Sequence, residues 1–353
     1  MASLTNQTQS LYRTLVPEIS VIIVNFNAGD RLEKCLKALD VQSYRDFEVI
    51  VIDNGSADDS ISAIKQGRAA DTPVHLIEAG ENLGFAAGNN RAVKRARGNW
   101  LAFLNPDAYP SPDWLASMMA GAERWPDVSA FGSTQLDAAD PTKIDGAGDV
   151  FHVFGIPYRG HFGWATDMLP ATGECFSPCA AGALYKRSVF EALGGFDERF
   201  FCYGEDVDLG FRLRLMGERS VQLREAVILH EGSAVSGRYS DFTVYHGNRN
   251  KIWATYKSMP GVLYWPLLPF QLAANFYLLA RSFTVGIGPS YWRALRDGFG
   301  GLGQFREDRR LLQRERKVSI RELAKVMTWS PLKVSKREAD LRPVDPLIES
   351  SQE

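Results

Sequence analysis

The sequence has little cysteine and little net charge. Four of its 353 residues are Cys, and no two of them form a Cys-x-x-Cys pair. This excludes a disulfide scaffold and a paired-cysteine zinc site. We expect four reduced thiols, the state found in the cytosol. The formal net charge of −2 gives the chain as a whole no electrostatic reason to bind nucleic acid.

The chain also lacks the Gly-x-Gly-x-x-Gly turn of dinucleotide-binding proteins. Residues 18–26 have the apolar pattern of a first strand, but the turn Asn25-Phe-Asn-Ala-Gly-Asp30 lacks the required glycines. This excludes a dehydrogenase of that kind. Residues 1–17 have neither the basic start nor the apolar core of a signal peptide, and we expect a loose polar leader there.

Strand and helix patterns alternate along the chain, as in an α/β protein. Apolar residues make up 45% of it, enough for a sizeable core. Short connections between such elements predict right-handed βαβ units and a parallel sheet. Residues 135–173 are rich in Gly, Pro and aromatics and are expected to be a long irregular excursion. The predicted strands are 18–26, 47–53, 74–77, 100–104, 128–133, 179–185 and 220–229, and the predicted helices include 57–66, 205–216 and 239–257.

The stretch Gly98–Asp107 combines an apolar run with a polar turn. Trp100–Leu104 is continuously apolar, as in a strand buried on both faces, and Pro106 ends it. Asn105 and Asp107 then stand at the carboxyl edge of a central strand, where open α/β sheets bind their ligands. A carboxylate there suits Mg²⁺ or Mn²⁺ held against a diphosphate. Asn-Pro-Asp is also good turn chemistry, so a plain turn is the alternative.

Two other segments are candidates to hold a nucleotide. Asp53 ends the second strand, where its carboxylate can accept a base or ribose hydrogen bond or can simply cap a turn. The segment Asn82–Asn90 leads into a helix, and its Gly84 and Gly88 permit close backbone approach. A helix N-terminus offers free N–H groups to an anion, although glycine-rich helix starts are common without any ligand.

Acidic residues crowd the start of the helix predicted at 205–216. Glu205, Asp206 and Asp208 lie in its first turn, where they complement the helix dipole. The aromatic residues before them, broken by Gly204, are more typical of a pocket wall than of a solvated cap. His230 stands at the end of the last predicted strand and is either structural or a metal ligand.

The C-terminal part of the chain combines apolar and basic segments. Residues 258–280 are 23 uncharged residues, long enough to span a bilayer, but prolines break their first half. Residues 281–342 carry 15 Lys and Arg against 7 Asp and Glu, a local excess of +8. Apolar aromatic surface beside cationic charge indicates a segment at a membrane surface. The alternative is a helical hairpin packed in a homodimer or against the catalytic domain.

Six motifs, taken in order, resemble those of inverting glycosyltransferases of family 2, which have the GT-A fold. Individually these motifs are weak, but six in register are specific, and the match runs from Ser20 to about Lys257. Within the family the chain looks most like bacterial rhamnosyltransferase-like enzymes, which build surface polysaccharide from dTDP-L-rhamnose on a lipid-linked acceptor. The motifs are Ile22–Asn27, Val51–Ser56, Asn82–Asn90, Asn105–Asp107, Gly204–Asp206 and His230.

The resemblance implies an α/β GT-A fold, in which a Rossmann-like, mostly parallel central sheet is flanked by helices. A C-terminal helical, membrane-associated extension would follow the transferase domain. The implied divisions are a leader (1–17), a transferase domain (18–257), an extension (258–342) and a tail (343–353). Within the domain, a nucleotide-sugar half would cover about 18–107 and an acceptor half about 108–257.

The resemblance also implies roles for single residues. Asp107 would bind Mg²⁺ or Mn²⁺, with His230 as a further ligand. Asp206 would be the catalytic base, and Glu205 beside it would shape the acceptor site. Asn105 departs from the Asp-x-Asp of many relatives, and its neutral amide would hold a metal less tightly. The implied nucleotide-binding residues are Asn25, Phe26, Asp53, Gly84, Asn90 and Asn105.

The implied reaction is a single displacement that inverts the sugar carbon. The donor would be dTDP-L-rhamnose, the acceptor a lipid-linked glycan, and the location the cytoplasmic face of the plasma membrane. One alternative keeps the chemistry but uses a UDP-sugar, for galactofuranosyl or N-acetylhexosaminyl transfer. The other is a membrane-docked scaffold without catalysis.

Overall fold

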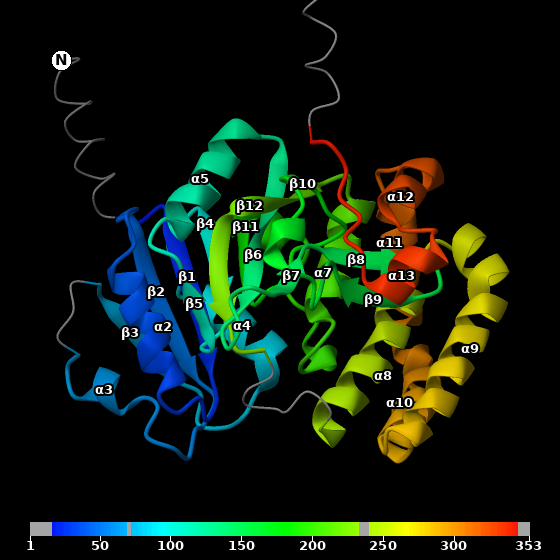
Figure 1. Cartoon of the computed structure of the whole chain (residues 1–353), viewed down its shortest axis with the longest axis horizontal. Helices are drawn as coiled ribbons and strands as arrows, with labels where there is room; N and C mark the ends of the chain where they lie inside the picture. The colour runs from blue at the N-terminus through cyan, green and yellow to red at the C-terminus, as the bar shows by residue number, and fades with distance from the viewer. Residues whose placement is uncertain (1–15, 69–71, 233–239, 345–353) are drawn as a thin grey trace, which may run out of the picture.

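The computed structural model describes residues 16–68, 72–232 and 240–344 as one layered α/β unit with a helical C-terminal part (Figure 1). Its strands are β1 (Ile19–Asn25), β2 (Phe47–Asp53), β3 (Val74–Glu78), β4 (Trp100–Leu104), β5 (Ala108–Pro110), β6 (Val128–Asp137), β7 (Ile144–Ala147), β8 (Asp149–His152), β9 (Ile156–Arg159), β10 (Gly173–Glu174), β11 (Gly182–Lys186) and β12 (Arg219–His230). Its α-helices are α2 (Arg31–Asp40), α3 (Ser62–Lys65), α4 (Gly84–Val93), α5 (Trp114–Arg124), α6 (Arg187–Ala192), α7 (Glu205–Leu215), α8 (Asp241–Ser258), α9 (Gly261–Thr284), α10 (Gly288–Gly300), α11 (Arg306–Glu315), α12 (Ile320–Val326) and α13 (Pro331–Lys336).

The main sheet has the order β10-β12-β6-β11-β4-β1-β2-β3. Its first half is parallel, since β1 pairs in parallel with β2 and β4, and β2 with β3. In its second half β11 runs antiparallel to both β4 and β6, while β12 runs parallel to β6. The predicted mostly parallel central sheet is therefore confirmed, with antiparallel pairs confined to the second half.

Helices cover both faces of this sheet. Val21 and Ile23 of β1 pack with α2 and α5 in one apolar cluster. Ile22 and Val24 point the other way and pack with α4, α6 and α7 in a second cluster. Every residue of β1 and β2 is buried, as the continuous apolar runs predict for strands covered on both sides.

The helix predicted at 57–66 is wrong in extent, because only Ser62–Lys65 is helical. The Asp58 carboxylate accepts hydrogen bonds from the backbone N–H groups of Gly29 (2.8 Å) and Ser60 (3.2 Å). Short polar side chains that bond to nearby backbone in this way compete with helix formation. The first part of the segment is therefore a turn tied to the loop after β1.

The irregular excursion predicted at 135–173 is also wrong. Strand β6 continues to Asp137, β7 pairs antiparallel with it, and β8 and β9 form a separate hairpin. Strands β7, β8 and β9 are only four residues long and contain Gly, Pro and Asp, so they lack the apolar runs that identify a strand from sequence. They carry acidic side chains toward the sheet edge where β4 ends.

The prediction that prolines break the segment at 258–280 is wrong as well, because Gly261–Thr284 is one helix that contains Pro266 and Pro269. A proline leaves the carbonyl four residues earlier without its helical donor. Here those residues are Val262 and Trp265, which are 72% and 60% exposed, so the freed carbonyls lie on the outward side of the helix. This helix forms the outer edge of the molecule, far from β1–β3 (Figure 1).

Candidate active site

Polar side chains meet where β1 and β2 end. Asn25 and Asp53 are register partners on these strands, and the Asn25 amide donates a hydrogen bond of 2.9 Å to the Asp53 carboxylate. The same amide donates to the hydroxyls of Ser56 and Ser60, and Asp53 also accepts the backbone N–H of Ser56 (3.1 Å). Both residues are buried. Their hydrogen bonds to Ser56 and Ser60 hold the loop after β2 in place.

A cavity of about 190 Å³ lies in front of this network, and we call it the first cavity. Four of the predicted site residues line it besides Asp107: Phe26, Gly84, Asn105 and His230. Gly84 has φ +80°, and a Cβ there would come within 2.6 Å of the Phe201 carbonyl oxygen. A glycine is therefore required for α4 to start against the cavity wall.

Asn90 lies elsewhere. Its amide donates to the Phe196 carbonyl (2.8 Å) and to the Glu198 carboxylate (3.0 Å), and its oxygen accepts the Phe196 N–H. It does not line the first cavity. The N-terminus of α4 is also partly occupied, because the Ala86 N–H donates to the Phe201 carbonyl (3.1 Å). These bonds fasten α4 to the segment that precedes α7.

Asp107 and His230 meet inside the first cavity. The His230 Nε2 lies 3.5 Å from an Asp107 carboxylate oxygen, and its Nδ1 lies 2.8 Å from the Asp145 carboxylate. Burial alone would raise the pKa of Asp107, but the hydrogen bond and charge of His230 outweigh it and lower that pKa. Burial alone would lower the pKa of His230, but Asp107 and Asp145 outweigh it and raise that pKa.

This donor set fits a divalent cation. One imidazole nitrogen and one carboxylate oxygen face each other, and the second imidazole nitrogen bonds to a further carboxylate. Histidines that bind metals are usually held in this way, with the other ring nitrogen on an acid behind them. Asp145, the acid in that position, was not among the predicted site residues, because it lies in the segment taken for an irregular excursion.

A second cavity, of about 280 Å³, adjoins the first. Both cavities share five wall residues, Phe85, Asn105, Arg159, Cys202 and Tyr203. Glu205 and Asp206 line the second cavity, at the first turn of α7. The structure thus brings the predicted metal residues and the predicted base into neighbouring cavities with a common wall.

The three acids at the start of α7 have different surroundings. Asp206 is half-buried and accepts backbone N–H bonds from Val207 (2.8 Å) and Ala180 (3.2 Å). Glu205 is buried, and one of its carboxylate oxygens has no partner among the described residues. Asp208 is fully buried in ion pairs with Arg212 (2.8 Å) and Lys257 (2.9 Å). Asp208 is therefore structural, and only Glu205 and Asp206 face the cavity.

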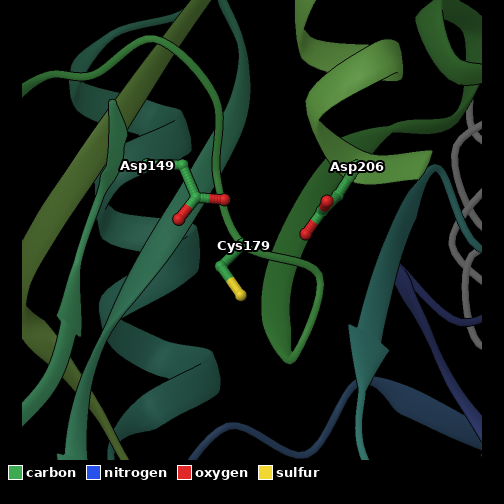
Figure 2. A group of neighbouring side chains, drawn as sticks. All are labelled: Asp149, Cys179 and Asp206. Atoms are coloured by element: carbon green, nitrogen blue, oxygen red, sulfur yellow. The ribbon is translucent and has the colours of Figure 1, made fainter. Parts of the chain in front are cut away.

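Two side chains that the sequence did not single out stand opposite Asp206. Figure 2 shows the Asp149 carboxylate across from Asp206, with the Cys179 side chain between them, and all three residues line the second cavity. One ligand atom from each of these three residues lies within 4.8 Å of the other two. Asp149 ends a Gly-rich stretch that starts at Asp145, and this spacing of two acids was the available signal.

Residues 20–194 match the family model described as "Glycosyl transferase family 2". The N-acetylglucosaminyl-diphospho-decaprenol L-rhamnosyltransferase of Mycobacterium tuberculosis is 29% identical over 245 residues, 62% of this chain and 78% of that protein. The uncharacterized glycosyltransferase YfnE of Bacillus subtilis is 38% identical over 254 residues, 60% of this chain and 64% of that protein.

Two solved structures share the fold. The mannosyltransferase PcManGT from Pyrobaculum calidifontis, in complex with GDP-Man and Mn²⁺, has a TM-score of 0.52 at 21% identity, covering 88% of this chain and 86% of that one. S. aureus TarS 1–349, in complex with UDP-GlcNAc, has a TM-score of 0.54 at 15% identity, covering 91% and 92%. Both are GT-A glycosyltransferases, so the fold class predicted from the motifs is confirmed.

Proposed function

The chain is a glycosyltransferase with a family 2 domain over residues 20–194 and a GT-A fold, and from this premise we propose that it transfers L-rhamnose from dTDP-L-rhamnose to a lipid-linked glycan. The observation that carries this proposal is the pair of adjoining cavities, one with Asp107 and His230 and the other with Asp206. The choice of sugar and acceptor is supported by the rhamnosyltransferase relative. A scaffold without catalysis is not favoured, since family and relatives agree on a transferase.

The first cavity would hold the nucleotide diphosphate. Asp107 and His230 would bind Mg²⁺ or Mn²⁺ there, and the ion would supply a Lewis acid for the charge of the leaving diphosphate. Phe26, Gly84 and Asn105 line the same cavity and would contact the nucleotide. Asn25 and Asp53 would act indirectly, by holding the loop that forms its floor.

The second cavity would hold the acceptor. The acceptor oxygen forms the new bond to the sugar carbon as the bond from that carbon to the diphosphate oxygen breaks, and the hydroxyl proton passes to Asp206. A carboxylate within hydrogen-bond reach is the group that this step needs. Because one base acts in one displacement, the sugar carbon is inverted, and no covalent enzyme intermediate forms.

The nucleotide preference is tested by thermal shift with a panel of nucleoside diphosphates and sugars, with and without Mn²⁺. A ligand at 100 times its dissociation constant should stabilise the fold by about 2.7 kcal/mol. We expect this with dTDP and dTDP-L-rhamnose. A response to UDP-sugars alone would favour galactofuranosyl or N-acetylhexosaminyl transfer instead. No response to any nucleotide would contradict the enzymatic proposal itself.

The base is tested by Asp206→Asn, which keeps the shape of the side chain and removes the proton acceptor. Turnover should fall by roughly 10²–10⁴, the usual contribution of a positioned general base. Affinity for dTDP should not change, because Asp206 lies in the second cavity. Near-normal transfer by this variant would assign the base to Glu205, the neighbouring acid of α7 that also lines the cavity.

We further propose that α9 places the enzyme on the inner face of the plasma membrane. This helix turns polar side chains, Gln271 and Asn275, toward the protein and exposes Trp265, Phe276 and Tyr277. It is 24 residues long and apolar, and its buried residues are Tyr264, Gln271, Asn275 and Ser282. A helix with its polar face inward and its aromatic face outward suits contact with lipid.

Liposomes that contain anionic lipid test this location. We expect the full chain to sediment with them at low salt and less at high salt, since salt screens the basic residues that follow α9. Replacing Trp265, Phe276 and Tyr277 with Ser should release the protein at every salt concentration. Full-length protein that stays in the supernatant at low salt would contradict the proposal, and a concentration-dependent dimer would then point to the homodimer instead.

A further inference from the structure

The carboxylates of Asp149 and Asp206 face each other across the second cavity, with the Cys179 thiol beside them (Figure 2). Their nearest ligand atoms lie within 4.8 Å. Two ionised carboxylates this close, in a poorly solvated cavity, repel each other, so the proton affinity of one of them rises. The question is which of the two holds the proton.

The two acids differ in their hydrogen bonds. Asp206 accepts backbone N–H groups from Ala180 (3.2 Å) and Val207 (2.8 Å). Asp149 is 7% exposed, and its carboxylate bonds to no residue within 16–68, 72–232 and 240–344. Bonds from N–H groups favour the ionised form of a carboxylate. The negative charge therefore belongs on Asp206 and the proton on Asp149.

The charges around the pair support the same assignment. Arg159 supplies one positive charge, but its guanidinium already forms an ion pair with Asp145. That charge cannot balance Asp145, Asp149 and Asp206 together. A proton on one of the two carboxylates removes one of these negative charges. The other ionisable groups around the pair are Asp145, Tyr158, Arg159, Cys179, Tyr185, Cys202, Glu205 and Lys251.

We propose that Asp149 carries a proton at neutral pH and donates a hydrogen bond to the acceptor, next to the hydroxyl that Asp206 deprotonates. The acceptor would thus present an oxygen beside its reacting hydroxyl, as neighbouring hydroxyls of a sugar ring do. Asp149 keeps its own proton throughout and acts as a specificity residue. This inference rests on the proposed function, in which Asp206 is the base.

The pKa directions agree with this geometry. Burial and the charge of Asp206 raise the pKa of Asp149 well above its ordinary value. Burial also raises the pKa of Asp206, but the backbone N–H groups of Ala180 and Val207 act in the opposite direction. Burial and Asp206 raise the pKa of Glu205 too. Asp206 is therefore the acid whose charge is best supported.

Two substitutions at one position separate a protonated Asp149 from an ionised one. Asp149→Asn replaces the O–H donor with an N–H donor of the same size. This variant should keep most of the transfer to N-acetylglucosamine linked through a diphosphate to a short-chain lipid. Asp149→Ala removes the donor and should lower kcat/KM for this acceptor roughly tenfold to hundredfold, the effect of losing one buried hydrogen bond. dTDP affinity should stay the same in both variants.

A pH profile gives a second readout. The wild type should lose acceptor affinity as the pH rises and Asp149 gives up its proton, whereas Asp149→Asn should keep its affinity. Asp46→Asn makes the same change at an exposed residue before β2 and should follow the wild type. Two results would overturn the proposal. One is that Asp149→Asn loses as much transfer as Asp149→Ala, and the other is that Asp149→Asn loses acceptor affinity at high pH just as the wild type does.

Two measurements do not depend on turnover. The infrared carbonyl band of a protonated carboxyl should be stronger in the wild type than in Asp149→Asn at pH 7, and an equal band would overturn the assignment. If Zn²⁺ stabilised the wild type and Asp149→Asn abolished this stabilisation, the trio would bind a metal ion and the proposed proton on Asp149 would be wrong. Full transfer by Asp206→Asn would instead contradict the base of the proposed function, whatever Asp149 does.

Discussion

At the scale of single residues, the His230 ring connects two acids from distant parts of the chain. Asp107 follows β4, Asp145 lies on β7, and His230 ends β12. The ring is 2% exposed, so its orientation is set by these partners and not by solvent. Asp145 holds Nδ1, which leaves Nε2 facing Asp107. In the proposed metal site the two neighbours would therefore have unequal roles, Asp107 as a ligand and Asp145 as the group that orients the ring.

We predict a graded effect on metal-dependent nucleotide binding. Asp107→Ala should abolish the part of dTDP affinity that Mn²⁺ adds, and His230→Ala should weaken it less. Asp145→Asn should lower metal affinity about 10–100-fold, as usual for groups behind a ligand. Calorimetry with Mn²⁺, before and after chelation, measures all three.

Asp46→Asn, which alters an exposed acid before β2, serves as the control. If the Asp145 variant bound Mn²⁺ like the wild type, His230 would be held by packing alone. If the His230 variant kept full metal dependence, that residue would return to a structural role.

The site residues differ in how far the sequence could reveal them. Asn105, Asp107 and His230 follow recognisable strands, so their shared edge could be predicted from topology. Asp145, Asp149 and Arg159 lie on four-residue strands that lack the apolar runs by which a strand is identified from sequence. Their approach to His230 and Asp206 is a tertiary contact, and no local pattern encodes it.

At the scale of elements, the connection between η2 (Glu198–Phe200) and α7 is strained. Phe201, Tyr203 and Gly204 have φ of +65°, +68° and +83°. Residues other than glycine seldom adopt a positive φ, so the strain lies at Phe201 and Tyr203. The amide of Asn250, on α8, donates to the carbonyls of Phe200, Cys202 and Tyr203 at 2.6–3.0 Å. Helix α8 thus holds the loop that presents Asp206.

Asn250→Ala should release this loop. Leaving buried carbonyls without donors costs about 1–3 kcal/mol for a buried group, so we expect a loss of that size in urea unfolding. Turnover should fall as well, since Asp206 loses its fixed position.

Asn250→Asp has the same size but presents carboxylate oxygens to three carbonyl oxygens, and it should be worse than Ala. An Asn250→Ala protein with normal stability and turnover would show that the strained loop holds itself in place.

Long apolar elements were predictable and short polar ones were not. β2 and β4 have the bounds that their apolar runs predict, because burial on both faces leaves no alternative pattern. The prediction of a helix at 57–66 was wrong in extent, because the Asp58 carboxylate bonds to backbone N–H groups there. The break at Pro266 and Pro269 failed because the outward side of α9 tolerates unpaired carbonyls.

At the scale of the whole molecule, Lys251 links the active site to the C-terminal helices. It lines the second cavity from α8 and is 8% exposed. Its ammonium group donates to the Asn248 amide (2.9 Å) and to the Tyr291 hydroxyl on α10 (2.7 Å). Burial lowers its pKa to about 7. The folded protein therefore buries the Lys251 ammonium at a cost, and burial of the neutral amine would be more favourable.

This burial predicts how stability depends on pH. Between the folded pKa of about 7 and the ordinary value near 10.5, the unfolded chain binds a proton that the folded chain does not. Stability should therefore rise with pH across that interval, by about 1.4 kcal/mol per pH unit from this residue.

Lys251→Met removes the titrating group. The variant should be at its most stable relative to the wild type at pH 7 and below, and this advantage should shrink toward pH 10. Denaturant unfolding across that range measures the difference. A difference that does not change with pH would mean that Lys251 stays charged in the fold.

The wall shared by the two cavities has a consequence for binding affinity. A ligand in the first cavity that shifts Tyr203 or Arg159 also reshapes the second cavity, because both residues line both cavities. Such coupling is reciprocal, so a nucleotide that tightens acceptor binding is itself bound more tightly by the same factor once the acceptor is present. Donor and acceptor would then bind cooperatively, and the dissociation constant of each would be higher when it binds alone than when the other is already bound.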